Sequence, residues 1–224
     1  MSSETLKAVG VSSALATYYV RTGWLTRLAR GVFMFPKDKL EATASVRFLA
    51  KQLPGLHVGG KTALAWRGVR HNVGSRERLV LWGNKAGKLP AWFTERFPAR
   101  YVARNLFVGT LPTDFGLQPL PEAPDGPLVS VPERALLELL AEVGIEQGLE
   151  EARNLVEGVR SVRLDTLGAL LQNCPRVKVV RLCLSLADEL NLNWAAEARA
   201  RVGPRGRGRW TGRMPDGTTL ILKP

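Results

Sequence analysis

One stretch of the sequence has the spacing of a phosphate-binding loop. Residues 55–62, GLHVGGKT, satisfy the pattern G-x-x-x-x-G-K-[ST], in which backbone amides cradle phosphate and the lysine reaches it. Such a loop requires a buried apolar strand directly before its first glycine. Residues 51–54 are instead the end of a predicted helix, and no strand ending in Asp is evident. The alternative is a structural turn at Gly59 and Gly60 before a helix that Lys61 or Thr62 opens.

Side chains that could bind a metal or act as a nucleophile are few. The two histidines, His57 and His71, have neither H-x-x-x-H nor H-E-x-x-H spacing, so we expect structural or surface roles. The two cysteines, Cys174 and Cys183, form no C-x-x-C pair and lie among apolar residues of predicted helices. We therefore expect buried thiols, no metal site and no disulfide scaffold.

Carboxylates are scattered, and the sequence does not pair them with a base or a nucleophile. The candidates are Asp114, Glu133, Asp165, Asp188 and Glu189. Glu133 and Arg134 are expected to form an exposed pair at the start of a helix. Because no Ser-His-Asp or Cys-His arrangement can be argued, we predict that the protein is not an enzyme, has no catalytic residue and uses no cofactor.

Two groups of arginines could contact phosphate. One surrounds Gly68 and Gly74, and the other alternates with glycine near the end of the sequence: Arg67, Arg70, Arg76, Arg78, Arg205, Arg207 and Arg209. Glycine lets the backbone follow an anion while the guanidinium groups contact phosphates. We predict a second basic surface from these residues. The alternatives are a solvated loop for the first group and a disordered loop for the second.

Residues 11–35 predict the principal binding element. Ser12 can cap a helix by accepting from the free amides of its first turn. Helical spacing then places Leu15, Ala16 and Tyr19 on an apolar face that can be buried. A second stripe is small and polar and ends in a cation, which suits base edges and phosphates. Its residues are Ser13, Thr17 and Arg21, with Tyr18 beside them.

A basic β-hairpin follows this helix. Gly23 can supply the left-handed residue that ends the helix, and residues 24–35 predict two short strands around a turn at 29–31. Arg27 and Arg30 would lie on or near that turn.

With a preceding helix over residues 4–9, capped by Ser3, this layout is a winged helix-turn-helix. A trihelical unit has one more helix before these two. Either the start of the chain is truncated or another element covers that apolar face. The alternative to DNA binding is that the helix and the hairpin are only packing units.

The net charge of +12 is unevenly distributed. It is +13 over residues 1–105, −7 over 106–160 and +6 over 161–224, which suggests two separate surfaces for polyanions. No amphipathic segment is long and basic enough to favour a membrane surface. The sequence shows no signal segment, and no apolar run approaches the roughly 18 residues of a membrane span. We expect a cytoplasmic protein whose partner is nucleic acid.

The remaining pattern predicts an α+β protein. Residues 40–53 predict a helix that is a candidate to complete the first domain. About four strands (79–82, 100–108, 116–120, 127–131) and a short helix over 90–97 follow. Five helices (133–143, 149–159, 163–171, 177–190, 194–202) and a strand over 218–222 end the chain. We predict a winged helix-turn-helix over 1–39. A mixed α/β domain over 54–224 would have a small sheet and a helical C-terminal half.

Five blocks together resemble the AbiEi family of antitoxins, which belong to bacterial toxin–antitoxin and phage abortive-infection systems. They are GWLTRLARGVFMF (23–35), LHVGGKTALAWRG (56–68), KLPAWF (88–93), VSVPERALLELL (129–140) and RVKVVRLCLSLADEL (176–190). The blocks follow the family's order, and VGGKTAL and SVPERALLELL are the most specific. The chain departs from the family in lacking a helix before the helix-turn-helix and in its Arg-Gly-rich tail, GPRGRGRW (203–210).

The resemblance implies an N-terminal winged helix-turn-helix and a C-terminal domain needed for antitoxicity. It implies repression of the protein's own operon through inverted repeats in double-stranded promoter DNA. It also implies action against a nucleotidyltransferase-type toxin encoded beside it, in most described cases without a stable complex. The alternative is an antitoxin that binds or modifies the toxin or its RNA substrate, with little DNA binding. Acidic helices over residues 133–157 would then meet a basic toxin surface.

Overall fold

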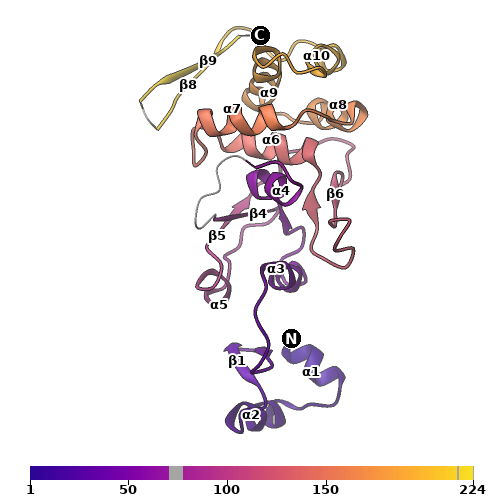
Figure 1. Cartoon of the computed structure of the whole chain (residues 1–224), viewed down its shortest axis with the longest axis vertical. Coiled ribbons are helices and arrows are strands. Elements are labelled where there is room, and N and C mark those ends of the chain that lie inside the picture. Colours follow the sequence, from indigo (N-terminus) through magenta and orange to yellow (C-terminus); the bar gives the residue numbers. More distant parts are fainter. Residues whose placement is uncertain (71–77, 216, 224) are drawn as a thin grey trace.

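The computed structural model describes residues 1–70, 78–215 and 217–223. Two residues singled out above, His71 and Arg76, lie outside this part of the chain. The fold is α+β and is elongated, with the N-terminal helices at one end and the C-terminal helices at the other (Figure 1). Within the described residues, no helix is both long enough and apolar enough to cross a bilayer.

The winged helix-turn-helix forms the N-terminal end of the molecule. It consists of α1 (Ser3–Ala8), α2 (Ser13–Arg21) and the antiparallel hairpin of β1 (Thr26–Ala29) and β2 (Val32–Met34). These elements share a small apolar core made of Leu6, Ala16, Leu25 and Phe33. This core is separate from the large core that fills the rest of the molecule.

The start of α1 differs slightly from the prediction. Its cap is Ser2 rather than Ser3, because the Ser2 hydroxyl accepts from the amide of Thr5 at 3.1 Å. The cap of α2 is as predicted, since the Ser12 hydroxyl accepts from the amide of Leu15 at 3.2 Å. Gly23 adopts φ +81°, the left-handed conformation expected after this helix.

A short connection leads from the hairpin to α3 (Ala42–Ala50), which lies within the predicted 40–53 helix. Its buried residues Val46 and Leu49 belong to the large core. Leu28 and Val32 of the hairpin also contact this core. The helix therefore connects the winged helix-turn-helix to the sheet (Figure 1).

The central sheet has five strands in the order β5-β4-β3-β7-β6. They are β3 (His57–Val58), β4 (Leu79–Gly83), β5 (Ala99–Ala103), β6 (Leu117–Gln118) and β7 (Val129–Ser130). Strands β4 and β5 are parallel, as are β3 and β7, whereas β3–β4 and β6–β7 are antiparallel. Strand β3 was not predicted, because two residues before a glycine pair are too few for a periodic signal. The short helices α4 (Gly60–Trp66) and α5 (Ala91–Thr94) accompany the sheet.

The five predicted C-terminal helices are confirmed. They are α6 (Pro132–Glu142), α7 (Leu149–Gly158), α8 (Leu164–Gln172), α9 (Val177–Glu189) and α10 (Ala195–Val202). Helix α6 is central, because it packs on α4 on one side and on α7, α8 and α9 on the other (Figure 1). Its side chains are almost all buried, polar ones included.

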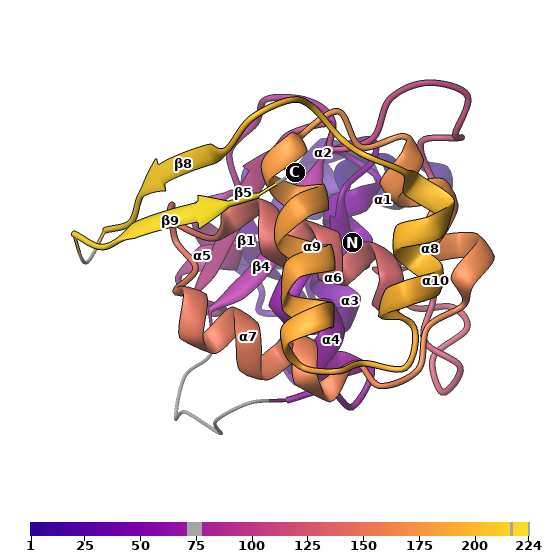
Figure 2. The same cartoon turned by 90° about the horizontal axis from the view of Figure 1, so that it is seen from above.

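The chain ends in an antiparallel hairpin of β8 (Trp210–Arg213) and β9 (Thr219–Leu222). Only the second strand was predicted. The hairpin extends from the side of the C-terminal helices, seen from above in Figure 2. It lies at the end of the molecule opposite to α2 (Figure 1).

Candidate DNA-binding surface and a buried carboxylate network

The polar stripe predicted on α2 faces solvent. Ser13, Thr17 and Arg21 are exposed, whereas Ala16 on the opposite face is 4% exposed. The Thr17 hydroxyl donates to the carbonyl of Ser13 at 2.9 Å, which leaves its lone pairs and its methyl group turned outward. The helix thus buries its apolar face in the small core and presents short polar groups to a partner.

The end of α2 carries a cation held by an aromatic ring. Tyr18 is 49% exposed, and the guanidinium carbon of Arg21 lies 5.8 Å from the centroid of its ring. Cation–π contacts at exposed sites are worth about 0.5–1 kcal/mol, enough to bias the arginine toward the outer face. Both side chains are therefore available on the surface of α2.

The hairpin is tied to the first helix and presents two more cations. The amide of Ser3 donates to the carbonyl of Gly31 at 2.9 Å, and the N-terminal amine donates to the carbonyl of Phe33 at 2.6 Å. Gly31 has φ +77°, so the turn favours glycine there. Arg27 and Arg30 are on the surface of the hairpin, and the guanidinium carbon of Arg27 lies 5.6 Å from the centroid of the Phe33 ring.

A groove of about 660 Å³ brings the helix and the hairpin together. Its lining includes Ser13 and Thr17 from α2 and Arg27 and Arg30 from the hairpin, whereas Tyr18 and Arg21 lie on α2 outside it. Lys7 of α1 adds a further cation, and no described residue lining the groove carries a carboxylate. Four of the six predicted DNA-contacting residues thus share one hollow.

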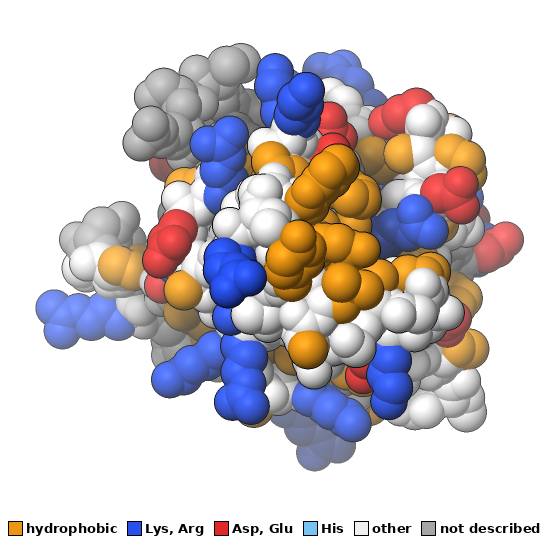
Figure 3. Space-filling view, turned by 90° about the horizontal axis from the view of Figure 1, so that it is seen from below, with side chains coloured by type: hydrophobic (Ala, Val, Ile, Leu, Met, Phe, Trp, Pro, Cys, Tyr) orange, Lys and Arg blue, Asp and Glu red, His pale blue; other side chains and the backbone are white. Residues whose placement is uncertain are grey.

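The same end of the molecule also carries apolar side chains. Figure 3 shows this end with a central apolar area bordered by Lys and Arg side chains. The exposed large hydrophobic residues of the N-terminal segment are Val9, Tyr18, Trp24 and Phe35, of which Trp24 is 71% exposed. Trp24 was not predicted as a surface residue. Its position directly after the helix-ending Gly23 could have indicated this, because it lies on neither the apolar nor the polar face predicted for the helix.

The described members of the first group of arginines, Arg67, Arg70 and Arg78, each contact an acceptor within the protein. The guanidinium of Arg67 donates to the carbonyl of Ser130 at 2.7 Å and to those of Gln118 and Val129 at 3.0 Å each, so it joins β6 to β7. Arg70 donates to the carbonyl of Ala65 at 3.2 Å. Arg78 lies 3.9 Å from a carboxylate oxygen of Glu146. Arg67 has a structural role, because backbone carbonyls accept from its Nε and Nη2 groups, and a phosphate contact by this group of arginines stays a prediction.

The members of the second group, Arg205, Arg207 and Arg209, differ in their exposure and contacts. Arg205 donates to the carbonyl of Gln172 at 2.8 Å, at the end of α8, so this side chain is also structural. Arg207 and Arg209 are exposed. Arg205 contacts the end of α8, whereas Arg67 contacts β6 and β7, so these two arginines are held by different elements.

A network of buried polar groups surrounds Glu138 on α6. Its Oε1 accepts from His57 Nε2 at 3.0 Å and from Arg134 Nε at 2.9 Å. Its Oε2 accepts from the Gly60 amide at 3.0 Å and from the Ser130 hydroxyl at 2.8 Å. Burial alone would raise the pKa of Glu138, but His57 and Arg134 outweigh it and hold the pKa below its usual value. The carboxylate is therefore ionised and fully bonded inside the protein.

This network decides between the two interpretations of residues 55–62, a phosphate-binding loop or a structural turn. The anion at the glycine pair is the protein's own carboxylate, so the residues 55–62 do not form a phosphate-binding loop. Ser130 donates to Glu138 and not to His57, whose Nδ1 lies 2.8 Å from the carbonyl of Gly55. His57 is therefore not placed to act as a base for this serine. The described residues contain no cluster that could hold a metal ion.

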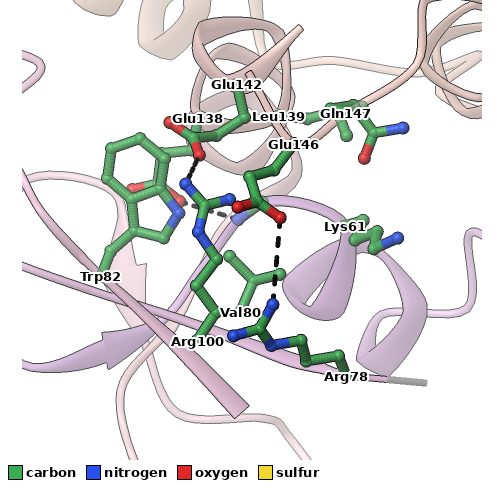
Figure 4. A pocket seen from close by; sticks show the side chains of 11 residues that line it. Lys61, Arg78, Val80, Trp82, Arg100, Glu138, Leu139, Glu142, Glu146 and Gln147 are labelled. Carbon is green, nitrogen blue, oxygen red and sulfur yellow. Dashed lines mark hydrogen bonds and ion pairs between the residues drawn. The ribbon is translucent and has the colours of Figure 1, made fainter. Parts of the chain in front are cut away.

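The other buried carboxylates of α6 are also paired. Glu133 is 2% exposed and accepts two bonds from the Arg163 guanidinium, at 2.9 and 3.1 Å. Burial opposes ionisation of Glu133, but the hydrogen bonds from Arg163 lower its pKa overall. Glu142 pairs with Arg100 and with Arg104, and Figure 4 shows Arg100 reaching it beside the Arg78–Glu146 pair.

The exposed Glu133–Arg134 pair was therefore a wrong prediction. Both residues are buried, and each pairs with a different partner. Three carboxylates of the acidic middle segment, Glu133, Glu138 and Glu142, are buried and pair with arginines. The alternation of charge along the sequence is thus partly internal, and it does not by itself mark two external surfaces.

Two family models together match residues 1–213 of the chain. The family described as "Transcriptional regulator, AbiEi antitoxin N-terminal domain" matches residues 1–75, and "Transcriptional regulator, AbiEi antitoxin, Type IV TA system" matches residues 76–213. The chain belongs to the AbiEi family. Members of this family are transcriptional regulator antitoxins of type IV toxin–antitoxin systems.

The AbiEi fold has a solved counterpart. The crystal structure of the RV2827C protein from Mycobacterium tuberculosis matches with a TM-score of 0.62 at 18% sequence identity, over 93% of this chain and 77% of that one. At this identity the likeness shows the fold alone. No curated protein matches the chain.

The Glu138 network explains the two most specific AbiEi blocks in this chain. His57, Gly59 and Gly60 come from the first block, and Ser130 and Arg134 come from the second. A Cβ at Gly59 would lie 2.4 Å from Glu138 Oε2 and 2.6 Å from a ring carbon of Trp82, so only glycine fits. The blocks form a structural junction between β3, α4, β7 and α6.

Proposed function

We propose that this AbiEi chain binds duplex promoter DNA through α2 and the β1–β2 hairpin and represses its own operon. In this proposal it binds inverted repeats and also counteracts a nucleotidyltransferase toxin. Residues 1–39 form the DNA-binding unit, and residues 54–224 form the unit that counteracts the toxin. The family description of a transcriptional regulator and antitoxin supports both roles in outline.

One observation carries the DNA-binding proposal. Ser13 and Thr17 of α2 and the hairpin residues Arg27 and Arg30, which lie apart in sequence, line one groove whose described lining contains no carboxylate. The guanidinium groups of Arg67 and Arg205 donate to backbone carbonyls, so these two arginines have structural partners. Arg27 and Arg30 differ, because no acceptor within the described residues contacts their guanidinium groups.

The arrangement suits the docking of a helix-turn-helix. The recognition helix of such motifs lies in the major groove and contacts base edges with its N-terminal residues. Ser13 and Thr17 occupy that position, and Tyr18 and Arg21 follow toward the phosphates. Arg27 and Arg30, on the hairpin, contact phosphate or the adjacent minor groove. Phosphate contacts position the protein, whereas the α2 side chains select the sequence.

A second candidate function is antitoxicity through contact with the toxin or its RNA substrate, with little DNA binding. The feature that favours it is α7, where Glu150 and Glu157 are exposed and Ile145 lies just before the helix at 52% exposure. Glu133, Glu138 and Glu142 do not contribute to such a surface, because they are buried and paired. An acidic surface of this kind would be complementary to a basic toxin.

A triple substitution in the full chain separates the two functions. Arg21→Ala/Arg27→Ala/Arg30→Ala should abolish a mobility shift on the upstream promoter and release repression of a reporter. It should leave rescue from the toxin intact, because these residues lie outside the proposed antitoxin unit. The matched control is Lys85→Ala/Lys88→Ala/Arg96→Ala, which removes the same charge from exposed positions elsewhere.

The control variant should repress and rescue as the natural protein does. A promoter shift that survives the α2–hairpin substitutions would refute the DNA-binding surface. Loss of toxin rescue together with repression would refute the division into two units, provided that the thermal unfolding midpoint of the variant is unchanged.

A further inference from the structure

The C-terminal hairpin has one face composed of cations, threonines and an isoleucine. Along both strands, exposed residues alternate with less exposed ones, as strand geometry requires. Thr211 pairs with Ile221 and Arg213 with Thr219, which places these four side chains on the same face. Arg209 and Lys223 continue the alternation and are exposed. We name this the ribbon face, and its residues are Arg209, Thr211, Arg213, Thr219, Ile221 and Lys223.

The opposite face of the hairpin is anchored to the helices. Leu222 is 3% exposed in the large core, and the ring of Trp210 lies 5.9 Å from the Lys178 ammonium. The buried guanidinium of Arg181 on α9 donates to the carbonyls of Arg205 and Gly208 at 2.7 Å each and to that of Leu222 at 3.3 Å. An isolated two-stranded hairpin is marginally stable in water, so these contacts fix its position.

The cations of the ribbon face differ in their ion pairing from those on α10. On α10, Arg199 pairs with Asp188, and Arg201 pairs with Asp165 and Glu197. Within the described part of the chain, no carboxylate or other acceptor contacts the side chains of Arg209, Arg213 or Lys223. Within the described residues, the fold therefore presents three cations without a carboxylate partner on a two-stranded ribbon.

We propose that the ribbon face is a second DNA-contacting element, which enters the major groove of duplex DNA. The major groove of B-DNA admits a two-stranded β-ribbon, whereas that of A-form RNA is too narrow for side chains to read. The three cations contact phosphates, and the threonines and Ile221 contact base edges. This inference goes beyond the proposed function, and either can fail without the other.

The position of the ribbon sets what it can reach. It lies at the opposite end of the long axis from α2 (Figure 1), so it contacts a different segment of DNA from the one that α2 contacts. One chain can therefore hold two duplex segments. The family match ends at residue 213, so β9 and Lys223 lie beyond the matched residues.

The test compares two triple variants that remove equal charge. Arg209→Ala/Arg213→Ala/Lys223→Ala removes the ribbon cations, and Lys85→Ala/Lys88→Ala/Arg96→Ala is the control. Fluorescence anisotropy with a duplex that lacks the operator is measured over a series of salt concentrations. The slope of log affinity against log salt is negative. In the ribbon variant, its magnitude should decrease by about 0.9 for each phosphate that the removed cations neutralise, and it should decrease less in the control. Equal slopes in the two variants would overturn the proposal.

A second comparison separates this inference from the proposed function. In the Arg21→Ala/Arg27→Ala/Arg30→Ala background, the remaining duplex binding should disappear when the ribbon substitutions are added. If the α2–hairpin substitutions change nothing while the ribbon substitutions abolish binding, the ribbon stands and the proposed function fails. An A-form RNA duplex of the same length should bind more weakly than DNA, and binding as tight as that of DNA would overturn the assignment. Unchanged circular dichroism and thermal midpoints exclude misfolding.

Discussion

The Oε2 oxygen of Glu138 accepts a hydrogen bond from the backbone amide of Gly60 at 3.0 Å, although 78 residues separate them. The carboxylate thus occupies the position at which a phosphate-binding loop would hold phosphate. Strand β3 lies inside the GLHVGGKT stretch, whereas a phosphate-binding loop has its strand before the first glycine. The spacing is the same, but the glycines serve a contact within the protein.

The first prediction concerns Gly59. Gly59→Ala should lower the free energy of unfolding by about 1–3 kcal/mol, because the added methyl group would overlap Glu138 and the buried ring of Trp82. Urea denaturation gives the change. Gly148→Ala is the control, since a Cβ there meets nothing within 4 Å, and as a change at the N-cap of α7 it should cost about 1 kcal/mol or less. Equal effects of the two substitutions would contradict the close approach at Gly59.

The second prediction concerns Glu138 itself. Glu138→Gln removes the negative charge but keeps the shape, and it leaves Arg134 buried without its partner. Removing one member of a buried ion pair typically costs about 3–5 kcal/mol, so the variant should unfold at a much lower urea concentration. Glu151→Gln, at the half-exposed Lys61–Glu151 pair, is the control and should cost about 1 kcal/mol or less. A small effect of Glu138→Gln would show that the network contributes little.

The third prediction is the acid sensitivity of the fold. The pKa values of Glu133 and Glu138 lie below the ordinary value of 4.5 in the folded state. As the pH falls, these carboxylates therefore bind protons in the unfolded chain before they do so in the folded chain. The stability that they contribute above pH 4.5 is lost progressively below that pH. The urea midpoint should fall steeply between about pH 4.5 and the lower folded pKa values. Glu138→Gln should flatten this fall, and an equally steep fall in the variant would contradict the assignment.

Local and periodic signals were sufficient for most of the elements. Apolar spacing predicted the C-terminal helices to within two residues at their ends, because each carries apolar residues at regular helical spacing. The Ser12 cap and the exposed stripe of Ser13, Thr17 and Arg21 also follow from local chemistry. Strands β3 and β8 were missed because they are short and begin or end at glycine-rich segments.

The pairing of buried charges could not be predicted in this way. Glu133 and Arg134 are adjacent in sequence at the start of a helix, which is typical of an exposed pair. Their partners, Arg163 and Glu138, depend on how α6 packs in the finished fold. Likewise, nothing local distinguishes Arg67, which joins two strands, from Arg30, which faces solvent.

The fourth prediction concerns the buried thiols. Burial raises the pKa of Cys183 to about 12, and Cys174 beside it adds to the shift. Because the thiolate is the reactive form, Cys183 should not react with a thiol reagent such as iodoacetamide at pH 8 in the folded protein. Both cysteines should react once the chain is unfolded in urea. Labelling of Cys183 in the native protein, located by peptide mass, would contradict its burial.

The fifth prediction separates base contacts from phosphate contacts in the proposed DNA complex. Arg30→Ala should weaken binding to all duplexes alike and lower the salt slope by about 0.9, because it removes one phosphate contact. Thr17→Ala should leave the salt slope unchanged but reduce the preference for the operator over an unrelated duplex, because Thr17 faces base edges. The measurement is binding of both duplexes by each variant over a salt series. A Thr17→Ala variant with the preference of the natural protein would remove α2 from sequence recognition, whereas a changed slope would place Thr17 at a phosphate.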